Sequence, residues 1–362
     1  MPDHQYQQTE FMRFVEREAG LSPRAKPDST RLILLFLSLD LQDGTKLKNV
    51  NPLWPQVFDR FRSSARQIVT QEQPGAKFVS DKIPYGIQQG WNFWKQIGDE
   101  VLFFLPIAVL SKEGGDAEGR GDVEFVEEAL IHFRGKSEVA TKHLHSCDML
   151  EIIWGQLEFI SGELENLSKA IHNCNSHGTQ NIISLKTTVW ISEVMEMSAA
   201  INSDVDGGFA RGKEVRNFFF QSKHNNKQID FLGPEIDMGF RIAKYAHRQK
   251  VAVCTATAYC MLRYLNEVKP SLSGNLKKFR IISYEKLKGV WSGREYPIIW
   301  FHHNMESGNV EKDTFYYFEK FNNVEVPRVI EIIKNYDPST NSIELIRHIL
   351  GDLPYRKIWS GD

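Results

Sequence analysis

A nearly continuous apolar run constrains this chain more than any other stretch of its sequence. The segment RLILLFLSLD, from Arg31 to Asp40, places apolar residues at both odd and even positions and ends in a carboxylate. A strand with one face in water would alternate apolar and polar side chains, so this pattern predicts a strand buried on both faces. The chain is therefore expected to contain a sheet, with Asp40 at the end of a central strand.

The composition indicates a folded chain with a large core. Of its 362 residues, 41% are apolar and 12% are aromatic. This length predicts one main domain with an appendage, or two domains, and the apolar content argues against a disordered protein. The net charge of -2 argues against a nucleic-acid binder, which would need a basic surface.

The cysteines and the start of the chain predict a soluble cytoplasmic protein. The four cysteines form no Cys-x-x-Cys pattern and are too few to staple a chain of this length, so we expect reduced thiols. The initial segment MPDHQYQQTEF is polar and contains no apolar signal region. The longest apolar runs are far shorter than the roughly 20 residues that cross a bilayer, so no membrane partner is expected.

The order of the remaining elements predicts an α+β sandwich, in which helices cover a sheet mainly on one face. After a loop at 41–52, apolar spacing predicts a helix at 52–69 and a long core helix at 145–173. Further helices are expected at 235–248 and 255–265, and strands at 76–87, 91–96, 101–107, 182–194 and 250–254.

Changes in composition predict the domain organisation. A polar tail occupies 1–30 and precedes a main domain at 31–270, which contains a Gly-rich, charged and exposed insertion near 111–122. From 271 to 362 the sequence predicts a C-terminal extension. Its expected elements are strands at 279–287, 296–303 and 314–321 and a helix at 325–336.

A second carboxylate lies in a setting that matches that of Asp40. The segment FWKQIGDEVLFF places Gly98 and Asp99 between two apolar stretches, which a tight hairpin alone would explain. If the hairpin lies beside the first strand, Asp40 and Asp99 meet where adjacent strands end. Two carboxylates held close together repel one another, and a pair of divalent metal ions would keep both ionised. Oxygen ligands favour Mg²⁺ or Mn²⁺.

Three motifs in this order resemble those of the class III nucleotide cyclases. They are LFLSLDLQDGTKLK at 35–48, KQIGDEVLFF at 95–104 and DFLGPEIDMGFR at 230–241. In that family a strand ending in Asp precedes a Gly/Thr turn, a Lys-x-Ile-Gly-Asp hairpin follows, and a late motif ends in Arg. The resemblance covers about residues 31 to 265 and implies a ferredoxin-like α+β fold with a mostly antiparallel central sheet.

The resemblance implies that the first two motifs bind metal and phosphate. Asp40 and Asp99, with the backbone carbonyl of Leu41, would hold two divalent ions, Mn²⁺ or Mg²⁺. The turn from Leu41 to Thr45, which includes Gly44, would present backbone N–H groups to the triphosphate.

The late motif implies an active site shared between two subunits. Arg241 would stabilise charge on the α-phosphate as pyrophosphate leaves. In this family the sites lie at the interface of a head-to-tail homodimer, with the metal carboxylates from one subunit and the arginine from the other. Asp237 stands where the family usually has Asn. It could orient Arg241 or the ribose, or it could form a surface ion pair with Arg241 four residues later.

The resemblance assigns Lys95 and Asp230 to recognition of the base. A Lys donor and an Asp acceptor satisfy adenine, cytosine and uracil alike, so this pair does not separate purines from pyrimidines. Trp54 is our candidate for the bulk that would exclude a purine, although a Trp at such a position is more often a core residue.

The form of the late motif and the inserted loops make the chain most similar to the bacterial pyrimidine cyclases of Pycsar antiphage defence. This similarity implies conversion of UTP, favoured over CTP, to a cyclic monophosphate that activates a separate effector protein. Two alternatives stay open: a purine cyclase that makes cyclic AMP or cyclic GMP, and an inactive cyclase-like module that binds a nucleotide. A phosphodiesterase of the HD kind would need histidine-rich motifs, which the sequence does not contain.

Two further groups of residues could bind a ligand or could simply be exposed to solvent. His143, His145 and Cys147 alternate as zinc ligands on a strand would, but they also suit the solvated start of the long helix. Lys46 and Lys48 could contact the triphosphate or simply face water.

Overall fold

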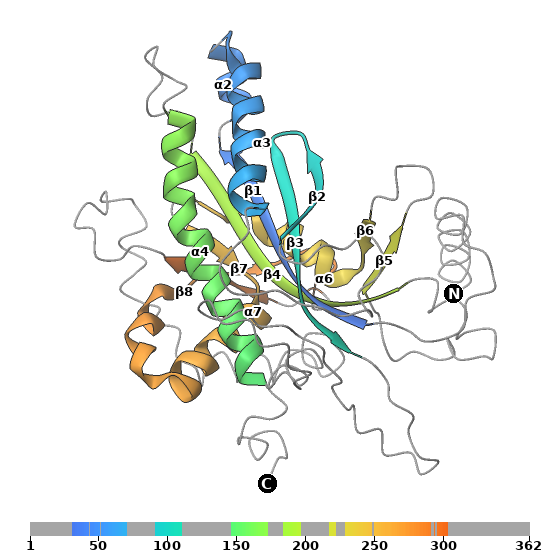
Figure 1. The fold of residues 1–362 in the computed structure, drawn as a ribbon, viewed down its shortest axis with the longest axis vertical. Coiled ribbons are helices and arrows are strands. Elements are labelled where there is room, and N and C mark those ends of the chain that lie inside the picture. Colours follow the sequence, from blue (N-terminus) through green and yellow to red (C-terminus); the bar gives the residue numbers. More distant parts are fainter. Residues whose placement is uncertain are drawn as a thin grey trace, which may run out of the picture.

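The computed structural model describes residues 31–42, 44–50, 52–70, 91–110, 146–172, 184–196, 217–221, 229–247, 250–290, 293 and 295–302. Nine strands in these ranges form one sheet with the order β2-β3-β1-β4-β7-β9-β8, and β5 and β6 extend it alongside β4 (Figure 1). The strands are β1 (Arg31–Gln42), β2 (Asn92–Ile97), β3 (Glu100–Leu110), β4 (Ser184–Glu196), β5 (Asn217–Gln221), β6 (Ile229–Leu232), β7 (Lys250–Val253), β8 (Phe279–Lys286) and β9 (Glu295–His302). The helices are α2 (Gly44–Val50), α3 (Trp54–Thr70), α4 (Ser146–His172), α6 (Pro234–Ala243) and α7 (Thr255–Arg263), followed by a π turn (Tyr264–Val268) and a 3₁₀ segment (Pro270–Lys278).

Strand β1 is the buried central strand that its apolar run predicts. The side chains from Leu32 to Leu39 are all nearly inaccessible to solvent. β1 pairs antiparallel with β3 on one side and with β4 on the other. Every described pairing of the sheet is antiparallel except those of β4 with β5 and with β7. The α+β architecture with a mostly antiparallel central sheet is therefore confirmed.

Helices cover both faces of this sheet. Phe103 and Phe104 are neighbours on β3, so their side chains point to opposite faces. The Phe103 ring packs on Phe93, which lies under the Arg66 guanidinium of α3. The Phe104 ring packs instead on Phe231 of β6, on the face that also carries α6. The long helices α3 and α4 pack against each other over the first face (Figure 1).

The long helix α4 confirms the helix predicted at 145–173. Leucine and isoleucine side chains recur on its inner face at helical spacing and are buried. These residues are Leu150, Ile153, Leu157, Ile160 and Leu167. The expected helix at 52–69 is likewise present as α3, whose buried face is formed by Val57, Phe58, Phe61, Ala65 and Val69.

Three elements differ from the sequence-based expectation. The loop expected at 41–52 is instead the end of β1 followed by helix α2, because Leu41 and Leu47 are buried and anchor the segment to the core. Strand β5, with the sequence NFFFQ, lies together with β6 where only a polar loop was expected. It is short, and its buried first residue Asn217 is polar, so it carries no clear strand pattern.

The strands expected at 279–287 and 296–303 are present as β8 and β9, and they continue the main sheet beyond β7. The boundary expected at about residue 270 therefore falls between strands of one continuous sheet. The tail at 1–30, the strand at 76–87, the insertion near 111–122, and the segments at 314–321 and 325–336 lie outside the described residues. No helix in the described ranges is long and apolar enough to cross a membrane.

Gly239 on α6 generates a stability prediction. A Cβ at this position would overlap the Trp190 indole, which is rigid and fully buried. We expect Gly239→Ala to lower the free energy of unfolding by about 1–3 kcal/mol. Gly162 on α4 has no atom within 4 Å of a Cβ position, so Gly162→Ala should raise it by about 0.5–1 kcal/mol. Urea unfolding measures both, and equal stability of the two variants would contradict the packing described.

Candidate functional site

The carboxylate of Asp40, at the end of β1, is partly buried and lies close to other negative charges. Asp40 is half-buried and lies opposite Glu100 of β3 and Lys186 of β4. Loss of hydration, with repulsion from Asp99 and Glu100, raises the pKa of Asp40 to about 6. Lys186 and a hydrogen bond from the Leu41 backbone act in the opposite direction and are weaker. The site therefore holds more negative charge than its own cations neutralise.

The turn between β2 and β3 presents Asp99 beside this strand end. Gly98 adopts a positive φ of 63°, which a glycine tolerates without strain. The Gly98 carbonyl accepts hydrogen bonds from Arg62 Nη2 of α3 at 3.2 Å and from Gln96 Nε2 at 3.0 Å. The Arg62 contact ties the turn to α3. Gly44, at the start of α2, lies so close to Asp99 that a Cβ would overlap its Oδ2 atom.

These oxygen donors suit a hard divalent cation. Asp40, Asp99 and Glu100 supply carboxylates at one place, and burial and Asp99 also raise the pKa of Glu100. Glu100 Oε1 already accepts a hydrogen bond from Ser38 Oγ at 2.5 Å, which leaves Asp40 and Asp99 as the better ligands. Within the described ranges no group of three His, Cys, Asp or Glu side chains is arranged to hold a metal by itself. A bound ion would therefore complete its coordination with water, phosphate or backbone oxygens.

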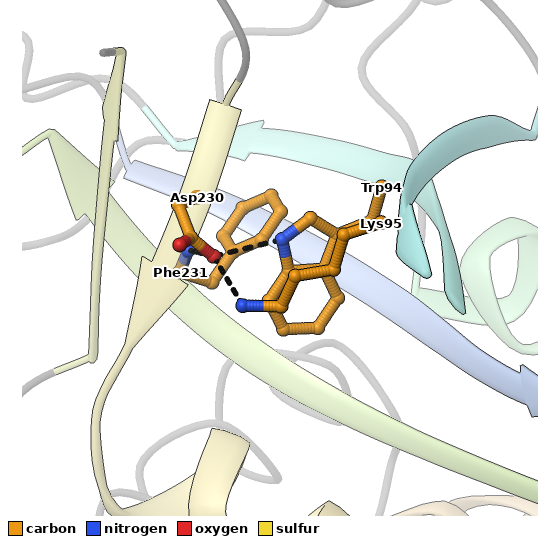
Figure 2. Close-up of polar contacts among 4 residues, drawn as sticks. All are labelled: Trp94, Lys95, Asp230 and Phe231. Carbon is orange, nitrogen blue, oxygen red and sulfur yellow. Dashed lines mark hydrogen bonds and ion pairs between the residues drawn. The ribbon is translucent and has the colours of Figure 1, made fainter. Parts of the chain in front are cut away.

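The structure brings Lys95 and Asp230 together from distant parts of the sequence. Lys95 Nζ lies 2.7 Å from Asp230 Oδ1, across the space between β2 and β6 (Figure 2). The same oxygen accepts hydrogen bonds from Trp94 Nε1 at 2.9 Å and from the Phe231 backbone N–H at 2.9 Å. The Lys95 and Asp230 side chains are 28% and 38% exposed, so a ligand can reach both. A hydrogen-bond donor and an acceptor thus stand side by side at the surface.

Helix α6 displays Arg241 and Asp237 without pairing them. Asp237 is exposed in the first turn, and Arg241 is half-buried in the last turn against Gly289. In the described part of the chain the two form no ion pair, and Arg241 Nε is buried without a hydrogen-bond partner. The surface Asp–Arg pair that their four-residue spacing allows is therefore absent.

The start of α6 is fixed by a buried polar network that the sequence did not reveal. The Glu235 backbone N–H donates to Asn217 Oδ1 at 3.0 Å, and Asn217 Nδ2 donates to Glu235 Oε2 at 2.9 Å. Ser192 Oγ of β4 donates to the same carboxylate oxygen at 3.0 Å. This network anchors the helix that carries Arg241 to β4 and β5. The only local signal was the Gly-Pro start of the helix, which says nothing about its partners.

Trp54 lies near the Asp40 and Asp99 carboxylates, because its neighbour Phe58 lies beside Gly44, which approaches Asp99. It begins α3, is half-buried, and its ring packs edge-on against Phe58 at 5.3 Å. The Lys48 ammonium lies over both rings, at 5.7 Å and 4.9 Å from their centroids.

Lys46 and Thr45 are exposed on α2. Of the alternating group near 145, Cys147 belongs to α4, and both histidines lie outside the described residues.

Comparison with known proteins identifies neighbours by structure alone. No protein-family model and no curated protein sequence matches this chain. The adenylyl cyclase CyaB from P. aeruginosa superposes with a TM-score of 0.40 and 9% identity, over 77% of this chain and 98% of that one. The guanylyl cyclase Cya2 gives 0.38 and 10%, over 78% and 98%. The guanylate cyclase domain of RhGC from Catenaria anguillulae in complex with GTP gives 0.35 and 12%, over 76% and 98%. Similarity at this level says nothing about the reaction, substrate or assembly of this chain.

The crowded carboxylates generate a prediction that needs no substrate. Replacing Asp40 or Asp99 with Asn removes one of the repelling charges, so the metal-free protein should melt at a higher temperature than wild type. The same variants should lose most of the stabilisation that Mn²⁺ gives to wild type. Thermal melts in EDTA and in Mn²⁺ measure both effects. Asp59→Asn, at an exposed position of α3, is the control and should change neither.

Proposed function

We propose that this protein is a metal-dependent nucleotide cyclase of the class III kind. The observation that carries the proposal is the presence of two complementary groups at the positions of the sequence motifs. The carboxylates Asp40 and Asp99 stand together at the end of β1, and the Lys95–Asp230 pair stands on β2 and β6. The first group suits metal and triphosphate, and the second suits the edge of a nucleobase.

The reaction is an internal displacement at phosphorus. The 3′-oxygen of the ribose attacks the α-phosphorus, the bond from that phosphorus to the β-phosphate oxygen breaks, and pyrophosphate leaves. The proton of the 3′-hydroxyl passes to solvent. Divalent ions held by Asp40, Asp99 and the Leu41 carbonyl would acidify the hydroxyl and neutralise the triphosphate. Backbone N–H groups around Gly44 would contact the phosphates, and Arg241 would stabilise the charge that develops on the α-phosphate.

The proposed active site needs two protomers. In the described part of the chain, no hydrogen bond or ion pair connects Arg241 to Asp40 or Asp99. Arg241 instead belongs with the base-recognising pair, since its neighbour Phe240 packs on Trp94, which binds Asp230. We therefore propose a head-to-tail homodimer in which the carboxylates of one protomer meet Arg241 of the other.

The proposed substrate is a pyrimidine nucleoside triphosphate, with UTP favoured over CTP. Lys95 can donate to O4 of uracil while Asp230 accepts from N3–H, and the same pair can bind N3 and the N4 amino group of cytosine. In the dimer, Trp54 beside the carboxylates of one protomer would limit the space for the base bound by the other. Its ring packs against Phe58 at the edge of the core but is only half-buried, so part of it stays accessible to a bound base.

The proposed biological role follows from the resemblance to the Pycsar cyclases. In that role the cyclic pyrimidine nucleotide is a cytoplasmic second messenger in antiphage defence, and it acts on a separate effector protein. The enzymology can be tested independently of this role.

The first experiment is to incubate the protein with each of ATP, GTP, CTP and UTP in Mn²⁺ and to identify the products by mass. Cyclic UMP or cyclic CMP as the main product would support the full proposal. Cyclic AMP or cyclic GMP would keep the cyclase and reject the pyrimidine preference. Metal-dependent nucleotide binding without any cyclic product would favour an inactive nucleotide-binding module.

A mixing experiment tests the shared site. Asp99→Asn should lack activity because a metal ligand is lost, and Arg241→Ala should lose turnover far more than nucleotide binding. A heterodimer of these two variants contains one site with neither change, so mixed and re-associated protomers should regain about a quarter of wild-type activity. No recovery, with heterodimers shown to be present, would contradict the head-to-tail arrangement.

Replacing Trp54 tests the proposed exclusion of purines. Trp54→Ala opens space beside the base, so it should raise kcat/KM for ATP or GTP relative to UTP and CTP by about tenfold. Trp54→Phe keeps most of the bulk and is the matched control. An unchanged ratio in Trp54→Ala would assign Trp54 to the core instead.

A further inference from the structure

We propose that Trp94 is a positioning residue that determines how selectively the protein recognises a nucleobase. The inference rests on the proposed function only in that the Lys95–Asp230 pair faces a base. No motif pointed to Trp94, which stands next to Lys95 at an irregular point in the pairing of β2 with β3.

One indole contacts both members of the pair. Trp94 Nε1 donates to Asp230 Oδ1 at 2.9 Å, and the Lys95 ammonium lies 4.4 Å from the centre of the Trp94 ring (Figure 2). A cation over an indole face is attracted to it, so the ring holds the ammonium as well as the carboxylate. Trp94 therefore sets the position of the donor and of the acceptor together.

The indole itself cannot move easily. Trp94 is 1% exposed, and its ring packs against Phe36 at 5.6 Å, Phe231 at 5.0 Å and Phe240 at 5.9 Å. A buried ring held by two edge-to-face contacts and one tilted contact has one well-defined orientation. The flexible Lys95 stem and the rotatable Asp230 carboxyl lack this restraint of their own. The rigidity of the pair comes from its buried neighbour.

The contacts at Asp230 leave one defined oxygen for a ligand. Oδ1 accepts from Trp94, Lys95 and the Phe231 backbone, whereas Oδ2 accepts from no group in the described part of the chain. A base must then offer an N–H to Oδ2 and an acceptor to Lys95 at a fixed spacing. Without the Trp94 N–H only Lys95 and the Phe231 backbone N–H hold Oδ1, so the carboxyl is held less firmly and bases with other spacings become acceptable.

Trp190 provides a matched control for the alternative that Trp94 is only a core residue. Its ring belongs to the same aromatic cluster and stacks on Phe36 at 5.2 Å. Its Nε1 atom is buried and makes no hydrogen bond to any described group. Trp190→Phe therefore makes the same change in the same cluster without removing a contact to the pair.

The experiment measures equilibrium binding of the four 3′-deoxynucleoside triphosphates in Mn²⁺ by calorimetry. These probes lack the 3′-hydroxyl and cannot be cyclised, so the measurement does not depend on turnover. For Trp94→Phe we expect affinity for the preferred nucleotide to fall by about tenfold, the usual loss for a hydrogen bond to a charged group. We also expect its preference over the other three to narrow by a similar factor. Trp190→Phe should keep the wild-type preference, and melting temperatures show whether both variants are folded.

Each outcome decides the role of Trp94. A narrowed preference in Trp94→Phe alone establishes the positioning role. An unchanged preference in Trp94→Phe, or an equal loss in both variants, overturns it, as does wild-type binding without any base preference. If wild type binds with a preference but makes no cyclic product from the natural triphosphates, the cyclase proposal fails while the binding test of Trp94 still holds. Should Trp94→Phe fail to fold, Trp94→His, which keeps a ring N–H, must fold and retain part of the preference, and a full loss there overturns the role.

Discussion

The burial of β1 on both faces is the constraint on which the rest of this structure depends. A strand without a polar face must be covered twice, and the chain does so with α3 and α4 on one side and with an aromatic layer under α6 on the other. That aromatic layer requires β6 to approach β2, since Phe231 packs on both Phe36 and Trp94. The approach brings Asp230 to Lys95. The packing that covers the apolar face of β1 therefore also brings the polar residues Lys95 and Asp230 together.

The two polar groups differ in how their charges are balanced. The negative charge of Asp230 is balanced within the chain, because one of its oxygens accepts from the Lys95 ammonium and from two further N–H donors. Asp40 instead faces like charges from Asp99 and Glu100 in a half-buried position, which raises its pKa. The first arrangement is complete and needs only a ligand that matches its shape. The second carries like charges close together and would gain stability from a bound cation.

The sequence predicts those features that have a local pattern. The run around Leu35 predicts β1 because both faces are apolar, and the turn at Gly98 predicts the β2–β3 hairpin. Helix α4 follows from its repeated apolar spacing. Lys95 and Asp230 could be named only from the resemblance of whole motifs, since nothing local to either residue indicates the other.

The features that escaped prediction are held by long-range contacts. Helix α2 depends on the burial of Leu47, and β5 depends on Asn217, which reaches Glu235 at the start of α6. Trp94 looks like any core aromatic until Asp230 is placed beside it. In the opposite sense, the spacing of Asp237 and Arg241 allows an ion pair that does not form.

The β2–β3 hairpin has a consequence for how two sites in a dimer would communicate. It carries Lys95 on its strand and Asp99 on its turn, only four residues apart. In the proposed head-to-tail dimer, Lys95 serves the site that contains its own Arg241, and Asp99 serves the other site. Each hairpin would then connect the two sites, and the hydrogen bond from Arg62 to the Gly98 carbonyl holds the turn of the hairpin against α3. A base that moved Lys95 in one site would act through this hairpin on a metal ligand of the other site, so the proposed dimer would couple its two sites.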